Sequence, residues 1–330
     1  MLIEIPLPKS CAGGVKLKEE AIKAENLTKF YGDLLAVDSI NLTIKKGEVF
    51  GFLGPNGAGK TTTIRMLTGI LQPDEGKARI LGVDIVHSST IAKRFMGVVP
   101  EVCNVYVDLS AWNNLMLMGK LYSVPAWERK ERGKELLEKF GLFERKDEKT
   151  RRFSRGMKQR LILAMSLIHR PSILFLDEPT SGLDVQSSRM IRQIVGELKH
   201  EGYTVFLATH NIEEANVMCD RVAIMNKGKI VAIDTPEKLK STIQKTQSVE
   251  VAFDNPPSKI GWLENIPEVD RLQRLGDKFR LYTSNPTVVI HRLVQYSRKN
   301  NLQFVSLNTV GPSLEDVFVR FTQNPEVPSR

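Results

Sequence analysis

The stretch with the most specific chemical pattern is residues 54–62, which read GPNGAGKTT. It matches G-x-x-x-x-G-K-[ST], in which glycines turn the backbone so that successive N–H groups face a phosphate chain. Lys60 would reach the β- and γ-phosphates of a nucleoside triphosphate, and the Thr61 hydroxyl would ligate Mg²⁺. A glycine-rich turn with no ligand is the alternative, but a chance match in a chain of this length is roughly a 1% event. The predicted nucleotide-binding residues of this loop are Gly54, Pro55, Asn56, Gly57, Ala58, Gly59, Lys60, Thr61 and Thr62.

Two consecutive carboxylates form a second candidate site. Asp177 and Glu178 directly follow the apolar residues 173–176. Four apolar residues before two acids indicate a strand that is buried on both faces, and ligands bind at the C-terminal ends of the strands in an open parallel sheet. Capping of the next helix is the structural alternative. With a phosphate loop upstream, the pair favours metal binding and the activation of water.

His210 and Tyr31 are candidates because of their positions. His210 comes just after the apolar segment 205–208, which is another predicted buried strand. A lone histidine usually has a structural role, and its place beyond that strand favours a functional one. Tyr31 lies upstream of the loop and has a ring that can stack on adenine, while an exposed tyrosine beside a turn is the alternative.

The elements that position these residues alternate between strand and helix. Residues 49–53 form an apolar run that enters the phosphate loop, and an apolar-periodic segment leaves it. Residues 110–143 have helical periodicity, and Pro125 separates them into two helices. The alternation predicts an α/β fold with a mostly parallel core sheet.

The pattern of predicted strands and helices changes after Lys240. The sequence beyond it predicts a ββαβα order for a small α+β domain packed on its own sheet. The strands are predicted at 269–275, 279–282 and 304–307, with helices that begin at Pro286 and Ser313. We therefore divide the chain into a leader (residues 1–21), a nucleotide-binding domain (22–240) and a C-terminal α+β domain (241–330).

Composition restricts the class of protein. Hydrophobic residues make up 42% and charged residues 26% of the 330 residues, as in ordinary globular proteins. No apolar run reaches the roughly 18 residues of a membrane span, and the N-terminus does not resemble a signal peptide, so we expect a cytosolic chain. Three scattered cysteines argue against a disulfide framework or a zinc site. The net charge of +9 is compatible with nucleic acid or an anionic membrane surface as a partner.

The order of these motifs resembles the nucleotide-binding subunit of an ATP-binding cassette (ABC) transporter over about residues 22–235. The motifs are the phosphate loop, Glu101, the stretch from Ser154, the acidic pair, and Ser181-Gly182-Leu183-Asp184 before His210. The form Ser-Arg-Gly-Met-Lys-Gln-Arg and the appended C-terminal domain resemble the ATPases of ABC-2 type drug, lipid and sodium exporters. The resemblance implies a P-loop NTPase fold with an antiparallel β subdomain and a helical subdomain beside the core sheet.

The resemblance also implies roles for single residues. Glu178, His210 and Lys60 are the implied catalytic residues: Glu178 orients or deprotonates the attacking water, and His210 contacts the γ-phosphate. Thr61, Glu101 and Asp177 are the implied Mg²⁺ ligands.

A third implied group completes the site from another subunit. Ser154 and Gly156 would bind the γ-phosphate of ATP held by a second copy in a head-to-tail homodimer, with Asp184 at the interface. An ordinary Ser N-cap is the alternative for Ser154.

Two departures from the family pattern affect these expectations. The usual Leu-Ser-Gly-Gly-Gln reads Phe153-Ser154-Arg155-Gly156-Met157, which keeps the hydroxyl and one glycine. Glu101 stands where the family usually has Gln, so a negative charge lies near the phosphates. We expect phosphate contact through Ser154 to survive and the coupling to the membrane subunit to change.

Two functions are compared. The favoured one is an ATP-hydrolysing subunit that uses ATP and Mg²⁺, forms a dimer and powers a separate membrane permease, with no nucleic acid as partner. It would lie on the inner face of the cell membrane through its permease and export drugs, lipids or ions. The alternative is a soluble ABC-type ATPase that acts on ribosomes or nucleic acid; such proteins carry two cassettes or an inserted coiled coil, and this sequence has neither. The C-terminal domain is expected to regulate or to stabilise the dimer, with a small-ligand sensor as the alternative.

Overall fold

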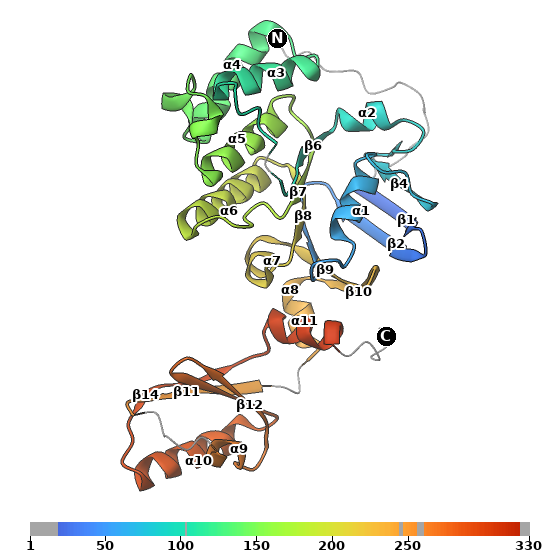
Figure 1. Ribbon diagram of the computed structural model, residues 1–330. Helices are drawn as coiled ribbons and strands as arrows, with labels where there is room; N and C mark the ends of the chain where they lie inside the picture. Colours follow the sequence, from blue (N-terminus) through green and yellow to red (C-terminus); the bar gives the residue numbers. More distant parts are fainter. Residues whose placement is uncertain (1–18, 103, 244–246, 256–260, 324–330) are drawn as a thin grey trace.

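The computed structural model describes residues 19–102, 104–243, 247–255 and 261–323 (Figure 1). The predicted leader therefore lies almost entirely outside the described residues, and so do Cys11 and Cys103. Cys219 is buried with a free thiol. Among the described residues, no helix combines the length and the apolar character needed to cross a membrane.

Most of the chain lies in short strands and helices. The strands are β1 (Glu20–Tyr31), β2 (Leu34–Lys45), β3 (Val49–Leu53), β4 (Glu75–Ile80), β5 (Val83–Asp84), β6 (Met96–Val99), β7 (Ile173–Asp177), β8 (Thr204–Thr209), β9 (Arg221–Asn226), β10 (Lys229–Asp234), β11 (Gln247–Phe253), β12 (Val269–Leu275), β13 (Lys278–Thr283) and β14 (Phe304–Val310). The α-helices are α1 (Lys60–Leu67), α2 (Ser89–Lys93), α3 (Ala111–Leu121), α4 (Ala126–Lys139), α5 (Arg155–Leu167), α6 (Val185–His200), α7 (Ile212–Met218), α8 (Pro236–Ser241), α9 (Gly261–Glu264), α10 (Pro286–Lys299) and α11 (Leu314–Gln323).

The central element is a six-stranded sheet in the order β10-β9-β3-β8-β7-β6. The strands β9, β3, β8, β7 and β6 run parallel, and β10 pairs antiparallel with β9 at the edge. A second, antiparallel sheet has the order β2-β1-β4-β5. Helices α3 and α4 form a separate helical region, and Pro125 lies between them as predicted. The α/β fold class with its antiparallel and helical parts is thus confirmed.

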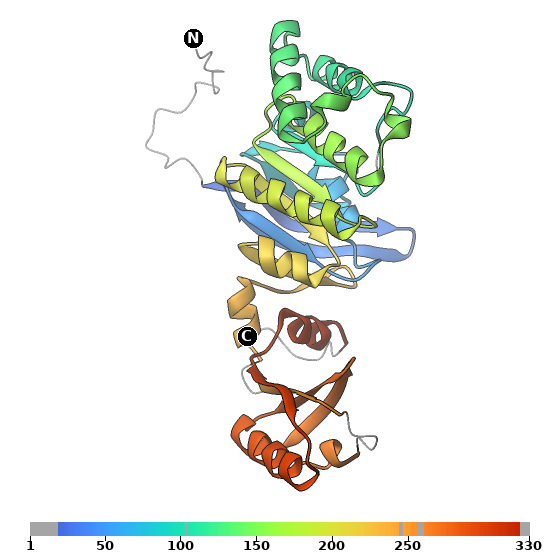
Figure 2. The same ribbon diagram turned by 90° about the vertical axis from the view of Figure 1, so that its left-hand side faces the viewer.

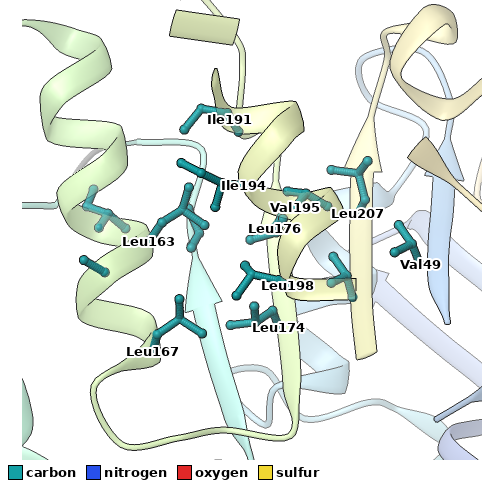
Figure 3. Packing of buried hydrophobic residues seen from close by; sticks show 14 of the residues in the cluster. Val49, Leu163, Leu167, Leu174, Leu176, Ile191, Ile194, Val195, Leu198 and Leu207 are labelled. Atoms are coloured by element: carbon teal, nitrogen blue, oxygen red, sulfur yellow. The ribbon is translucent and has the colours of Figure 1, made fainter. Parts of the chain in front are cut away.

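The two faces of the central sheet bury different side chains because residues alternate along each strand. The face under α1 carries Phe50, Phe52 and Phe175 around Phe206, with ring centroids 5.3 to 6.0 Å apart. The opposite face is aliphatic and lies under α5 and α6 (Figure 3). Residues labelled there are Leu163 and Leu167 of α5, Ile191, Ile194, Val195 and Leu198 of α6, and Leu174, Leu176, Leu207 and Val49 of the sheet.

The C-terminal part contains one strand and one helix more than the sequence predicts. Its sheet has the order β12-β13-β11-β14 with antiparallel neighbours, and the chain order is βαββαβ followed by α11. This is the split β-α-β arrangement with both helices on one face. The predicted ββαβα order is therefore incomplete, because it omits β11 and α9.

The last helix also packs differently from the prediction. Leu314 and Val317 of α11 are buried in the aliphatic core of the ATP-binding part, and α11 contacts α7, α8 and β9. Both views place α11 between the C-terminal sheet and the rest of the molecule (Figures 1 and 2). Tyr282 of the C-terminal sheet donates a hydrogen bond to Asp316 of α11 at 3.2 Å. Helix α11 therefore connects the two parts, and the expectation of a small α+β domain packed on its own sheet does not hold for this helix.

His169, just beyond α5, joins the helical region to the central sheet. Its ring stacks on Tyr122 with centroids 3.6 Å apart, and Nε2 donates to the Met96 carbonyl oxygen at 2.9 Å. Burial lowers the pKa of His169 from its ordinary 6.5 to about 4. The neutral ring is therefore the stable form in the folded protein.

This buried ring predicts a pH dependence of stability. Between pH 6.5 and 4 the unfolded chain binds a proton at His169 and the folded chain does not, so acidification should destabilise the protein by up to roughly 3 kcal/mol. Thermal unfolding from pH 8 to pH 4.5 should show a smaller loss for His169→Gln, whose amide can donate to the same carbonyl and does not titrate. An equal fall in melting temperature between pH 8 and pH 4.5 for the wild type and His169→Gln would contradict this account.

Candidate functional site

The phosphate loop joins β3 to α1 and is shaped by close backbone contacts. Gly59 has φ +107°, and a Cβ there would lie 2.5 Å from the Ala36 carbonyl oxygen. A Cβ on Gly54 would lie 2.5 Å from the Met225 carbonyl oxygen. Because backbone cannot move aside as a flexible side chain can, both positions require glycine. Asn56 is exposed at the tip of the loop.

The first turn of α1 is free to bind an anion. Its N-cap is Gly59, which has no side chain to satisfy the N–H groups, and the turn contains no acidic residue. Such a helix start favours phosphate through its N–H donors and its dipole. Lys60 is buried beside it, and its ammonium donates to the carbonyl oxygens of Gly54 at 2.8 Å and Pro55 at 3.2 Å. Ala58 is buried, and Thr61 and Thr62 are half-buried in the same segment.

Glu178 brings three distant parts of the sequence together. Its Oε1 lies 3.3 Å from Lys60 Nζ, and its Oε2 accepts a hydrogen bond from His210 Nδ1 at 2.8 Å. The Glu178 side chain is only 7% exposed, while that of His210 is half exposed. Glu178 has φ +49°, a conformation that costs energy for a residue with a Cβ. The predicted catalytic residues Lys60, Glu178 and His210 are thus neighbours in space.

Asp177 lies next to them and fits a cation. Its Oδ1 is buried without a hydrogen-bond partner, and its carboxylate interacts with the Thr61 hydroxyl. Burial is the largest cause that raises the pKa of Asp177, and the charges of Glu101 and Glu178 raise it further. A buried carboxylate oxygen and a hydroxyl are hard oxygen ligands of the kind that Mg²⁺ prefers. In the described part of the chain, no group of three or more His, Cys, Asp or Glu forms a complete metal cage, so phosphate oxygens would have to complete the coordination.

Ser154, Gly156 and Asp184 form a second group. Ser154 is the N-cap of α5 and accepts from the Met157 N–H at 3.3 Å. A Cβ on Gly156 would lie 2.3 Å from Ser187 Oγ, and Ser187 donates to Asp184, the N-cap of α6. Helices α5 and α6 lie against the aliphatic face of the sheet and α1 lies against the aromatic face, so this group and the phosphate loop belong to helices on opposite sides of the sheet (Figure 1).

Two other candidates are also outside the cluster around Glu178. Tyr31 ends β1 at the hairpin to β2, where it pairs with Leu34, and is 46% exposed. Glu101 is exposed just after β6 and acts on Asp177 through its charge.

Glu214 is a further residue of this region that was not predicted from the sequence. This residue is 1% exposed on α7, and its carboxylate accepts hydrogen bonds from Thr180 and Thr209. Its spacing of four residues from His210 is visible in the sequence. The preceding Glu213 has a side chain that is 70% exposed, and sequence alone does not distinguish the two acids.

The chain has relatives of known family. The family described as ABC transporter matches residues 37–181. The linearmycin resistance ATP-binding protein LnrL of Bacillus subtilis is 35% identical over 91% of this chain and 98% of the relative. The Nod factor export ATP-binding protein I of Rhizobium sp. is 35% identical over 93% and 98%. The daunorubicin/doxorubicin resistance ATP-binding protein DrrA of Streptomyces peucetius is 41% identical over 68% of each chain.

Solved structures that are similar to this chain belong to the same family as these relatives. The chain is similar to cbiO1 of Clostridium perfringens, part of the ABC transporter complex cbiONQ, with 30% identity and a TM-score of 0.63 over 68% of this chain and 92% of that one. It is also similar to a dimeric ATP-binding cassette in a post-hydrolysis state with ADP and Pi, with 28% identity and a TM-score of 0.59 over 65% and 98%. These findings support the transporter prediction and not the alternative on ribosomes or nucleic acid. The chain belongs to the ATP-binding cassette transporter family, as one of its ATP-binding, ATP-hydrolysing subunits.

Proposed function

We propose that two copies of this chain bind ATP head to tail, hydrolyse it at Glu178 and so drive a separate membrane permease that exports drugs, lipids or ions. The observation that carries the proposal is the buried Glu178 carboxylate, which lies between Lys60 and His210. It follows β7, in the same sheet as β3, the strand that leads into the phosphate loop. The names of the three relatives, which concern drug resistance or Nod factor export, support the export direction. Through its permease the chain would lie on the inner face of the cell membrane.

The chemistry follows from the positions of these groups. A carboxylate that is already fixed by two partners can accept the proton of an attacking water without reorientation. The Lys60 ammonium and the His210 ring offer donors to the phosphate oxygens on which charge increases. Asp177 and Thr61, with Glu101 nearby, would hold Mg²⁺, which supplies charge neutralisation on the phosphates when it is bound.

The dimer is proposed because one chain does not bring Ser154 to its own phosphate loop. Ser154 and Gly156 lie at the start of α5, and α5 packs on the opposite side of the sheet from α1. An exposed helix start with a hydroxyl can bind the phosphate of ATP held by a second copy. Asp184 and its neighbours would then contact the partner, and Tyr31 would stack on adenine.

We assign the domains as residues 22–240 for ATP binding and 241–330 for regulation or stabilisation of the dimer. Helix α11 supports the regulatory role, because it contacts α7, and α7 begins two residues after His210. Asn226 also donates to the carbonyl oxygen of Thr322 in α11 at 3.1 Å. A change in the C-terminal sheet can therefore reach the segment that carries His210.

Replacement of Glu178 by Gln tests the proposed reaction. The amide cannot accept a proton, so turnover should fall by about 100-fold or more, while ATP binding remains. ATP that is bound but not hydrolysed should also hold the dimer closed, which light scattering would detect as a doubled mass. Glu213→Gln is the control, because its side chain is exposed. Undiminished hydrolysis by Glu178→Gln would contradict the assigned role.

Asp177→Asn tests the cation site. Burial raises the pKa of Asp177, so its ionised form costs stability at neutral pH, and this cost disappears as the pH falls below its ordinary value of 3.8. The variant without ATP should therefore have a higher melting temperature at pH 7 and lose the increase in ATP affinity that Mg²⁺ gives. Asp184→Asn is the matched control. Hydrogen bonds from Ser187 lower the pKa of Asp184, so removal of the Asp184 charge should not raise the melting temperature at pH 7. A lower melting temperature for Asp177→Asn would show that its charge is stabilised.

Val317→Asp tests the role of α11. Val317 is fully buried against the ATP-binding part, so a charge there should release the helix. Release should lower hydrolysis and let α11 unfold locally, so that trypsin cleaves after Arg320, which is exposed but lies within the folded helix. Val305→Asp, at a position 69% exposed in the same domain, should do neither. Tryptic release of α11 with unchanged hydrolysis and unchanged dimer formation would exclude the regulatory role.

A further inference from the structure

Glu214 occupies an unusual environment for an acid in the first turn of a helix. Acidic residues favour this turn because of the helix dipole, and most remain in solvent. Glu213 does so, with a side chain that is 70% exposed. Glu214, the next residue of α7, is turned inward and is 1% exposed.

Both oxygens of the Glu214 carboxylate have partners from different segments. Oε1 accepts a hydrogen bond from Thr180 Oγ1, and Oε2 accepts one from Thr209 Oγ1 at 3.1 Å. Arg192 of α6 places its Nε 3.8 Å from Oε1 and so offsets the buried charge. Thr209 Oγ1 in turn accepts from the Asn211 N–H at 2.9 Å.

The two threonines that donate to Glu214 lie close in sequence to the proposed catalytic residues. Thr180 lies two residues after Glu178, in the loop that leads to Asp184, and Thr209 directly precedes His210. One carboxylate thus connects the segments whose side chains meet at 2.8 Å between His210 Nδ1 and Glu178 Oε2. The connection is buried, where hydrogen bonds to a charged group are strong and resist exchange with water.

Stability alone accounts poorly for an acid at this position. A buried carboxylate loses its hydration, and even a paired one is often replaced by apolar side chains without loss of stability. The two hydroxyl groups that donate to Glu214 come from the loop after Glu178 and from the end of the strand before His210, and these two segments must keep a fixed spacing. The geometry therefore accounts for the carboxylate better than stability does.

We propose that Glu214 is a positioning residue, which fixes the loop after Glu178 against the segment that carries His210. This inference rests on the proposed hydrolysis at Glu178. The backbone bond from the Glu178 N–H to the Ala208 carbonyl oxygen at 2.9 Å keeps the two strand ends together in any variant. Loss of one hydrogen bond at Glu214 frees the parts beyond these ends, the loop after Glu178 and the turn into His210, so the carboxylate and the imidazole lose their alignment. The binding of ATP should not change, because neither oxygen of Glu214 contacts the phosphate loop or α1, and the bond from the Gly54 N–H to the Thr209 carbonyl oxygen at 3.3 Å is a backbone bond that does not involve the Thr209 hydroxyl.

The test is steady-state hydrolysis by the purified full chain with ATP and Mg²⁺. Glu214→Gln keeps the shape but leaves one oxygen to accept, so kcat should fall by about tenfold to 100-fold with KM changed by less than about twofold. Thr180→Val should lower kcat in the same way, and Thr180→Ser, which keeps the hydroxyl, should restore it. The double variant Glu214→Gln/Thr180→Val should lose less than the product of the two single effects. Glu213→Gln, the neighbouring exposed acid, should leave kcat unchanged.

Three outcomes would overturn the inference. These are a wild-type kcat for Glu214→Gln, an equal kcat for Thr180→Val and Thr180→Ser, or a loss confined to KM. Thermal unfolding of each variant separates a lower folded fraction from a lower kcat, and the comparison of Val with Ser at position 180 decides the matter even if Glu214→Gln folds poorly. A wild-type chain that binds ATP but hydrolyses none would refute the proposed function itself, whereas an active wild type with an equally active Glu214→Gln refutes only the role of Glu214.

Discussion

The carboxylate of Glu178 can be buried only because Lys60 and His210 stand on either side of it. An unpaired charge with this little exposure would cost too much free energy. The three residues come from the ends of three neighbouring strands, β7, β3 and β8, or from the turns that follow them. Parallel pairing places these ends at one edge, with Leu53 beside Thr209 and Asp177 beside Ala208. The sheet register thus sets the arrangement on which the chemistry depends.

The two faces of the same sheet explain why the site is divided. Aromatic residues fill the face under α1, and aliphatic residues fill the face under α5 and α6. Each helix is held where its own apolar side chains find partners. Helix α5 consequently carries Ser154 away from the phosphate loop of its own chain, which is the physical basis for the proposed second copy.

Helix α7 connects several parts of the molecule although it is short. It carries Glu214 toward Thr180 and Thr209, it begins two residues after His210, and it contacts α11. The C-terminal sheet reaches α11 through the hydrogen bond from Tyr282 to Asp316. A continuous set of contacts therefore leads from the C-terminal domain to the segment beside the buried carboxylate.

Features that depend on neighbouring residues could be predicted from the sequence. The glycines and Lys60 of the loop, the acidic pair after an apolar strand and the helix break at Pro125 are local patterns, because each needs only a few adjacent residues to form. The sequence does not distinguish Glu213 from Glu214, and it does not show that α11 packs on the ATP-binding part. These points depend on the fold, since the burial of a side chain is set by segments far away in the sequence that come to lie against it.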